Sequence, residues 1–312
     1  MKKIYDNYQD TNFNYKNIIS TKNVKQTQDD NGNLYYTTFD SSDLHIPGQK
    51  IWKYNISTRD NEIYWENKEF KVGSFHMIID IKGNIYLSSA GGVIILNNKN
   101  QFKTMPLVSG MVTDIIYLKN NIYVTTFDGL YKYNINTEIT EKINLPNNLI
   151  VNSIFIDKNE NIYLAIYKSI NKPISYSVLI IKKGQSEAKP IIGDDFFNIN
   201  DTMLITEINS KIYFYSLNLA SKKAKLYYSD LDSNKVNYVL DLSINVQTLF
   251  NLNNELGLVT HEIGNTVIEV LNIDSIEKKY EIKNSVYEQI MQIQKFNILS
   301  LLNENKIDYL SW

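Results

Sequence analysis

The stretch DIKGNIYLSS, residues Asp80 to Ser89, decides the fold of this 312-residue chain because it recurs along the sequence. In each copy a turn rich in Asp, Asn and Gly is followed by Asn, an apolar residue and usually Tyr. Clear copies begin at Asp29, Leu118 and Asp157. The fainter copies are INSKIYFYS (208–216), LNNELGLVT (252–260) and IQKFNILSLL (293–302). Such self-similarity indicates a repeat architecture with one supersecondary unit per copy.

The spacing of the copies predicts the architecture. From Tyr35 to Leu299, corresponding positions are separated by 51, 37, 40, 50, 44 and 42 residues. Periods of about 40 to 50 residues with four strands each are typical of β-propeller blades. The 23 Tyr and 12 Phe residues, against 5 Pro, also favour strands. We therefore predict an all-β chain with a single domain over residues 1–312, a seven-bladed β-propeller with four antiparallel strands per blade.

The strands of one blade can be assigned from the second copy. FHMIID is predicted as its innermost strand, NIYLSSA as the second, GVIILNN as the third and QFKTMPL as the outermost. A second repeated segment supports this order, since KIWKYNIST (50–58) matches GLYKYNINT (129–137). Both segments fall where a third strand belongs.

The chain ends predict how the ring closes. KIDYLSW ends the sequence inside what should be the third strand of the last copy, so that blade lacks an outer strand. The only unassigned strand material precedes Asp29. A ring without a free edge needs that strand, because unpaired edges promote association between sheets. We expect part of residues 3–20 to complete the last blade.

Composition excludes several classes of function. The formal net charge is -2, so the chain lacks the excess of basic residues that is typical of proteins with a nucleic-acid partner. There are 0 Cys residues, which excludes disulfides and thiolate sites. No apolar run approaches the roughly 18 residues of a membrane span, and MKKIYDNYQD is not a signal peptide. As the sequence stands we expect a cytoplasmic protein without membrane insertion, or an extracytoplasmic one if an export signal has been removed.

Three segments carry a family resemblance. PLVSGMVTDIIYLKNNIYVTTFDGLYKYNINT (106–137) resembles the repeat of the two-component-regulator propeller family, and HMIIDIKGNIYLSSAGGVIIL and VNSIFIDKNENIYLAIY fit the same template. The resemblance is strongest in residues 27–166. Tyr86, Tyr123 and Tyr163 stand where the family's repeat favours Trp. The resemblance implies the propeller fold and a sensing or binding role, and it brings no catalytic residue.

Few residues suit catalysis. The histidines are His45, His76 and His261, and His76 opens an apolar strand, where a structural role is the commoner one. His261 and Glu262 could form a general-acid pair, but neighbours on a strand point to opposite faces unless the strand has ended. Streptogramin lyases of the virginiamycin type are seven-bladed propellers that use histidine with nearby acids, and their clustered pattern is not found here. A lyase or hydrolase at the channel mouth is the alternative function.

The acidic turns and the lysine-rich segment have structural explanations. The turns that begin at Asp29 and Asp157 lack the glycine and the closing Glu of a calcium loop, so we predict tight turns with positive φ and no metal or cofactor site. SKKAKLYY (221–228) combines lysines with tyrosines, as surfaces for single-stranded nucleic acid do. A solvated strand edge with charged residues is the commoner explanation and the one that we predict.

Two insertions indicate where a ligand could bind. The long periods place extra residues between the second and third strands of two blades, at 39–49 and 167–176. Insertions confined to one rim often mark the binding face, although they can also be tolerated surface loops without a partner. We predict a non-catalytic binding or sensing module that holds a protein or small polar ligand at this rim. The candidate contacts are Phe39, Asp40, His45, Phe127, Asp128, Lys168, Tyr176, His261 and Glu262.

Overall fold

The structure is a computed structural model, whose described residues form strands and one short helix, α1 (Asp195–Ile199). It describes residues 14–20, 26–29, 31–38, 50–55, 57–66, 76–89, 91–97, 99, 101–145, 149–167, 176–231, 233–252, 254–262, 265–272, 275–282, 289–293, 298–303 and 306–311. Among these residues, no helix has both the length and the apolar character that crossing a membrane requires. The secondary structure is therefore all-β in class, as predicted.

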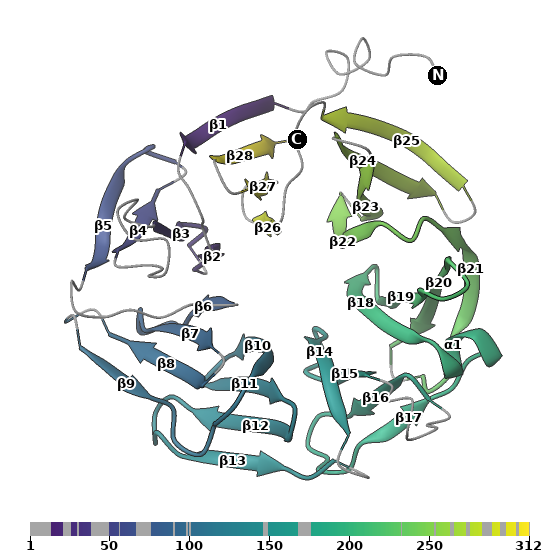
Figure 1. The fold of residues 1–312 in the computed structure, drawn as a ribbon, viewed down its shortest axis with the longest axis horizontal. Coiled ribbons are helices and arrows are strands. Elements are labelled where there is room, and N and C mark those ends of the chain that lie inside the picture. The colour runs from purple at the N-terminus through teal and green to yellow at the C-terminus, as the bar shows by residue number, and fades with distance from the viewer. Residues whose placement is uncertain are drawn as a thin grey trace. The chain divides into compact units, whose positions relative to one another are not determined.

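The chain divides into two compact units. Unit 1 consists of Met1–Val124, Lys132–Glu141 and Val286–Trp312. Unit 2 consists of Thr125–Tyr131 and Lys142–Ser285. Each unit is built from four-stranded sheets, in which consecutive strands of the sequence lie side by side (Figure 1).

Three sheets lie wholly in unit 1, and in each of them neighbouring strands are antiparallel. The first is β2-β3-β4-β5, with bounds Gln26–Gln28, Leu34–Thr38, Lys50–Tyr54 and Asn61–Glu66. The second is β6-β7-β8-β9, with bounds Met77–Ile79, Ile85–Ser89, Gly92–Leu96 and Phe102–Thr104. The third is β26-β27-β28-β1, with bounds Gln289–Ile293, Ile298–Asn303, Lys306–Ser311 and Asn14–Ser20.

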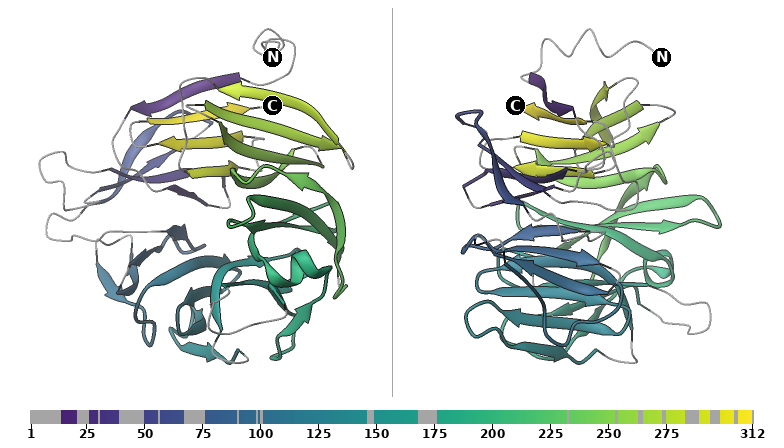
Figure 2. Two further views of the ribbon diagram at one scale, coloured as in Figure 1. Left: turned by 45° about the vertical axis from the view of Figure 1, so that its right-hand side comes forward. Right: turned by 60° about the vertical axis from the view of Figure 1, so that its left-hand side comes forward.

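The third of these sheets joins the two ends of the chain. Strand β1 lies beside β28 and pairs with it antiparallel (Figures 1 and 2). In the register of this pair, Lys16 lies opposite Tyr309. The outer position of β1 is the place that the sequence predicted for a strand from residues 3–20. The last strand of the chain thus has a hydrogen-bonded neighbour on each side.

Three further sheets lie wholly in unit 2, again with antiparallel neighbours. The first is β14-β15-β16-β17, with bounds Ile150–Ile156, Ile162–Tyr167, Val178–Ile181 and Lys189–Ile191. The second is β18-β19-β20-β21, with bounds Asp201–Ile208, Lys211–Asn218, Lys223–Asp230 and Asn237–Leu242. The third is β22-β23-β24-β25, with bounds Val246–Leu252, Glu255–Glu262, Asn265–Asn272 and Ser275–Ile282.

One more sheet, β10-β11-β12-β13, supplies residues to both units. Its strands have the bounds Val112–Leu118, Asn121–Thr126, Gly129–Asn134 and Thr140–Ile143. The two matching segments, 50–58 and 129–137, were predicted to contain third strands. They contain β4 and β12, and each of these is the third strand of its sheet. The four strands assigned to the second copy are likewise present in the predicted order, as β6 to β9.

The lysine-rich segment requires a correction. The stretch at 221–228 enters β20, which lies between β19 and β21 in its sheet. It is therefore an inner strand and not the solvated edge that we predicted, because β21 follows it and takes the outer position. Its lysines alternate with buried Ala224 and Leu226, and Tyr227 is buried in a second apolar cluster, as expected for an inner strand of a sheet packed on both faces.

Recurring side-chain hydrogen bonds hold three of the repeated turns. Between β6 and β7, the carboxylate of Asp80 accepts hydrogen bonds from the backbone N–H groups of Lys82 and Asn84, at 2.8 and 2.9 Å. It also accepts from the side-chain amide of Asn84 at 2.9 Å and from the hydroxyl of Tyr86 at 2.7 Å. The turns between β2 and β3 and between β14 and β15 repeat the Asn and Tyr bonds. The Asp, Asn and Tyr of the repeat therefore tie each turn to the strand after it.

The same turns have the backbone conformation that the sequence predicted. Gly32, Gly83 and Glu160 have φ values of 79°, 81° and 68°. Glycine adopts this region without a steric cost, which explains why two of the three copies have glycine there. The prediction of tight turns with positive φ is confirmed at these positions.

Apolar side chains fill the space between successive sheets within each unit. In unit 1, one buried cluster joins the first two sheets and consists of Tyr35, Ile51, Trp65, Met77, Ile79, Ile85, Leu87 and Leu96. In unit 2, another joins the second and third sheets and includes Ile208, Tyr215, Leu217, Leu226, Val246, Leu249, Leu256, Leu258 and Leu271. A further cluster, which includes Tyr163, Ile180, Phe214 and Tyr227, joins the first and second sheets of unit 2. Both faces of that second sheet are thereby covered, which a single repeat could not achieve.

Candidate functional site

Of the nine residues predicted for the rim, three have side chains that the structure describes. Phe39, Asp40, His45 and Lys168 lie outside the described residues. The insertions that carry them begin and end where expected, since 39–49 separates β3 from β4 and 167–176 overlaps the connection from β15 to β16. Both insertions therefore connect the second and third strands of their sheets.

Phe127 and Asp128 form the turn between β11 and β12. Phe127 is 53% exposed. Both oxygens of Asp128 are bonded within the turn, because Thr126 donates its hydroxyl to Oδ1 at 2.5 Å and Tyr131 donates to Oδ1 and Oδ2 at 2.9 and 2.8 Å. Nζ of Lys142 lies 3.4 Å from Oδ2. The bond from Thr126, with smaller effects of Tyr131 and Lys142, lowers the pKa of Asp128, so it is a carboxylate held by its own turn.

The other three predicted residues whose backbone is described lie in unit 2, just before β16 and at the end of β23. Tyr176 is half-buried just before β16, and burial raises the pKa of its hydroxyl. His261 and Glu262 are the last two residues of β23, where they pair with Thr266 and Asn265. Both residues lie within β23, which continues through Glu262, so the strand has not ended before this pair.

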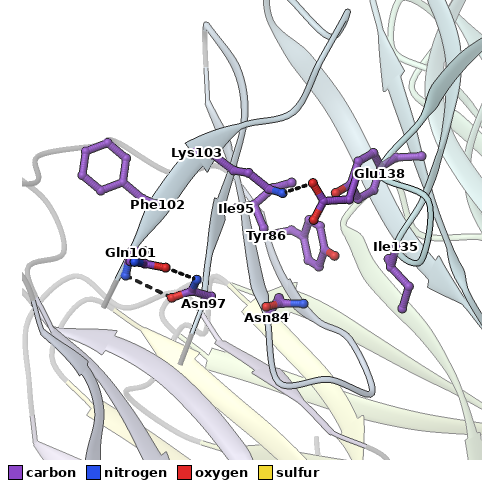
Figure 3. Close-up of a pocket in the computed structure, with 10 residues that line it drawn as sticks. Asn84, Tyr86, Ile95, Asn97, Gln101, Phe102, Lys103, Ile135 and Glu138 are labelled. Atoms are coloured by element: carbon purple, nitrogen blue, oxygen red, sulfur yellow. Dashed lines mark hydrogen bonds and ion pairs between the residues drawn. The ribbon is translucent and has the colours of Figure 1, made fainter. Parts of the chain in front are cut away.

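A cavity with a volume of about 490 Å³ lies elsewhere, in unit 1 (Figure 3). It is bounded by strands β7, β8 and β9 of one sheet and by the end of β12. The lining residues are Asn84, Tyr86, Ile95, Asn97, Gln101, Phe102, Lys103, Tyr133, Ile135 and Glu138. We call it the Tyr133 cavity. Its size falls within the range of about 300 to 1,000 Å³ typical of ligand pockets.

The charges at this cavity are balanced. Nζ of Lys103 forms an ion pair with the carboxylate of Glu138, and the Tyr86 ring lies beside the pair (Figure 3). On the other side, Nδ2 of Asn97 donates to Oε1 of Gln101 at 3.0 Å. Phe102 is 54% exposed and points away from the other side chains (Figure 3). Because the one cation and the one anion neutralise each other, the lining carries no net charge.

A single tyrosine hydroxyl is left free to bond at this cavity. Tyr133 is only 2% exposed, and its ring lies 6.2 Å from that of Tyr86. The Tyr86 hydroxyl is bonded to Asp80, whereas the Tyr133 hydroxyl makes no hydrogen bond to any described residue. Burial, with smaller effects of Glu138 and Asp80, raises the pKa of Tyr133 to about 12. It is thus a neutral donor and acceptor whose bonding capacity the described protein does not use.

The repeated turns position these groups. Asn84 and Tyr86 are fixed by the carboxylate of Asp80, as described above. Nζ of Lys82 in the same turn donates to the carbonyl oxygen of Ile135 at 3.0 Å, which joins the turn to the end of β12. Asn97 and Gln101 stabilise the turn between β8 and β9. The cavity therefore lies at the strand ends where the first strand of a sheet connects to the second and the third connects to the fourth. The insertions connect second and third strands, so they lie at the opposite strand ends.

Two smaller described cavities are built in the same way. One, of about 270 Å³, lies in unit 1 beside the turns of Asp29 and Asp80. The other, of about 330 Å³, lies in unit 2 beside the turns at Asn209 and Asn254. From the sequence we predicted only tight turns at these positions, and the cavities were not predicted. In unit 1 the recurring Asp, Asn and Tyr were the available signal, because they place Tyr35 and Tyr86 beside the turns.

Comparisons with known proteins show the fold. No protein-family model matches the chain, and no curated protein matches it. Similar solved structures include the extracellular domain of BT4673 of B. thetaiotaomicron, described as a hybrid two-component system, with a TM-score of 0.67 and 13% identity. That match covers 95% of this chain and 39% of the other, so the chain spans well under half of that protein's length. The resemblance to the two-component-regulator propeller repeat is confirmed at the level of fold.

Two further similar structures match over nearly their whole length. Virginiamycin B lyase from Staphylococcus aureus has a TM-score of 0.65 and 12% identity, with 96% of this chain and 99% of that chain covered. YCF48 bound to D1 peptide has a TM-score of 0.63 and 10% identity, with 96% and 97% covered. At such identities the likeness establishes a β-propeller fold and carries no activity with it.

Proposed function

We propose that the two units together form one closed, seven-bladed propeller, a single domain that serves as a non-catalytic binding or sensing module. The average spacing of about 44 residues between copies supports seven blades of equal design. The pairing of β1 with β28 supports closure, because it supplies the last sheet with an outer strand from the other end of the chain.

The observation that carries the proposed function is the unused hydroxyl of Tyr133 in a charge-balanced cavity. The Tyr133 ring is buried, but its hydroxyl oxygen is accessible from the cavity, so water or a ligand can supply the hydrogen bond that no described residue supplies. The ion pair of Lys103 and Glu138 leaves no net charge to attract an ion. These groups suit a small uncharged ligand that offers hydroxyl or amide groups. An uncharged segment of a protein partner would use the same groups.

A catalytic role has less support in this cavity. General acid–base catalysis needs a titratable group within hydrogen-bond reach of the reacting atoms, with a pKa near the working pH. Glu138 is already paired with Lys103, and the raised pKa of Tyr133 keeps its proton in place at neutral pH. Both groups can therefore hold a ligand, while neither is poised to transfer a proton.

The rim of insertions stays a second proposed contact region for the same ligand class or for a protein. Phe127 is the described residue that best fits this role, since it is exposed and lies in the turn between a second and a third strand. Asp128 would act by holding that turn, because both of its oxygens are already bonded. The likeness to YCF48, which was solved with a peptide, supports a protein partner as the alternative occupant.

The test is a melting experiment on the full chain with uncharged probes. N-acetylglucosamine, maltose and the N-acetylated dipeptide amide Ac-Gly-Ser-NH2 would each be titrated, because a ligand of the folded state raises the melting temperature. We expect at least one to raise it in a saturable way, and Tyr133→Phe to abolish the rise. Phe127→Ala should preserve it. A rise that survives Tyr133→Phe but disappears in Phe127→Ala would move the site to the rim, and no rise with any probe would contradict the small-ligand proposal.

A further inference from the structure

We propose that unit 2 contains a separate site for a small carboxylate with an apolar body, in the cavity between the sheets β18–β21 and β22–β25. This cavity has a volume of about 330 Å³. That volume is at the lower end of the range of ligand pockets, so it suits a small molecule. The site is distinct from the Tyr133 cavity, both in the residues that line it and in the ligand class that it fits.

The inner wall of the cavity is apolar. Ile208, Leu226, Leu256 and Leu271 line it, and all four are at most 5% exposed. They belong to four strands of the two sheets, so the wall is fixed by the core of unit 2. Each Å² of apolar ligand surface removed from water here is worth about 25 cal/mol, which favours a hydrocarbon body against this wall.

The outer part of the cavity carries a cation and two free hydroxyls. Nζ of Lys211 lies 4.2 Å from the centroid of the Tyr228 ring, and Lys211 forms no ion pair with any described residue. The rings of Tyr213 and Tyr228 are 6.3 Å apart, and neither hydroxyl hydrogen-bonds to a described residue. An ammonium group beside two O–H donors matches the acceptor oxygens of a carboxylate.

The turns on both sides hold Lys211 at the cavity. Lys211 is the first residue of β19, directly after Asn209 and Ser210, whose φ values are 51° and 65°. Nδ2 of Asn209 donates to the carbonyl oxygen of Asn254 at 2.7 Å, so the turn before β19 is tied to the turn before β23. The cation is therefore anchored at the junction of the two sheets.

One residue of the lining limits the charge of the ligand. Glu255 lies at the start of β23, and it is the single carboxylate among the residues that line this cavity. It would repel a dianion more strongly than a monoanion, because the repulsion grows with the charge of the ligand. A monoanionic carboxylate is therefore favoured over a phosphate monoester. Removing the charge, as in Glu255→Gln, should tighten the binding of a carboxylate.

The test compares two probes that share the same apolar body and differ in whether the polar end is a carboxylate or a neutral amide. Calorimetric titration of the full chain would use 3-phenylpropionate and its neutral amide, 3-phenylpropionamide. We expect the acid to bind roughly tenfold more tightly, since hydrogen bonds to charged groups are the stronger ones. Acetate, which has the carboxylate without the apolar body, should show no saturable binding. Equal affinity for acid and amide, or no binding of the acid, would overturn the proposal.

Matched variants locate the site. Lys211→Met should remove the preference for the acid, with a melting curve recorded to show that the variant is folded. Lys225→Met is the control, because Nζ of Lys225 also stacks on aromatic rings, at 4.8 Å from Phe196 and 5.1 Å from Tyr238, but does not line the cavity. An equal loss in both variants would contradict the site. So would a loss caused by Tyr133→Phe, a variant that tests the proposed function independently.

Discussion

The hydroxyl of Tyr86 donates a hydrogen bond of 2.7 Å to Oδ2 of Asp80, a carboxylate that is itself only 3% exposed. The corresponding distances are 3.1 Å between Tyr35 and Asp29 and 3.2 Å for the pair in the turn before β15. The recurring sequence motif thus has a structural role, because one Asp carboxylate accepts hydrogen bonds both from the turn and from the second strand of the sheet. In the sheet β6–β9 the same hydrogen bonds fix one wall of the Tyr133 cavity.

Removing this acid should destabilise the chain. Asp80→Ala leaves the donors of Lys82, Asn84 and Tyr86 without their buried acceptor. We expect the free energy of unfolding to fall by about 2 to 4 kcal/mol, measured by denaturant titration. Asp60→Ala is the control, because Asp60 is exposed, and its effect should stay within about 0.5 kcal/mol. Equal effects of the two variants would contradict the role given to Asp80.

The two tyrosines of the cavity should respond differently to the loss of a hydroxyl. Tyr86→Phe removes a hydrogen bond to a carboxylate and should cost about 1.5 to 3 kcal/mol of stability. Tyr133→Phe removes a hydroxyl that no described residue contacts by a hydrogen bond, so we expect a change below about 0.5 kcal/mol. Denaturation curves of both variants decide this. A large loss in Tyr133→Phe would show that its hydroxyl has a structural partner.

Gly257 should resist replacement because of an aromatic ring on the neighbouring strand. It pairs with Phe250 across β22 and β23, and a Cβ atom at Gly257 would lie 2.2 Å from the ring. We expect Gly257→Ala to lower the stability by about 1 to 3 kcal/mol through overpacking. In a double-mutant cycle with Phe250→Leu, the combined loss should be smaller than the sum of the single losses. Additive losses would show that the ring is not the cause.

Stability should decline at alkaline pH through buried tyrosines. Burial raises the pKa of Tyr36, Tyr133 and Tyr215 to about 12, above the value of about 10 in an unfolded chain. Between these values the unfolded chain has released protons that the folded chain retains, so the free energy of unfolding falls as the pH rises from about 10 to about 12. Denaturant titrations across this range, with tyrosinate absorbance as the second probe, would show it. A constant stability through the range would contradict these shifts.

Much of the fold could be predicted because it is encoded locally and then repeated. The four strands β6 to β9 were each marked by a short apolar or alternating run, and β4 and β12 by their matching sequences. The inner position of β20 was missed, because the lysines at 222, 223 and 225 suggested an edge. The charged residues of a strand indicate which of its faces is in contact with solvent. Whether that strand lies at the edge of its sheet depends instead on whether the next strand pairs with it.

The candidate site was harder to predict because it forms between sheets. Tyr86 and Tyr133 belong to different copies of the repeat, and no local pattern states that their rings lie 6.2 Å apart. Nor does the sequence reveal that the hydroxyl of Tyr86 is bonded while that of Tyr133 is free. Insertions are visible in a sequence, so the prediction favoured the rim that carries them, while the described cavities lie at the opposite ends of the strands.

The most direct test of the central claim, that the two chain ends share one sheet and close a single propeller, uses a disulfide. The chain has 0 Cys residues, so Lys16→Cys with Tyr309→Cys introduces the only two thiols, on directly opposed positions of β1 and β28. Opposed Cα atoms lie about 4.5 to 5.5 Å apart, within reach of a disulfide. Lys16→Cys with Ser300→Cys, one strand further away, is the control. We predict an intramolecular disulfide in oxidised monomers of the first pair alone; free thiols in both pairs, or equal cross-linking of the two, would contradict the claim.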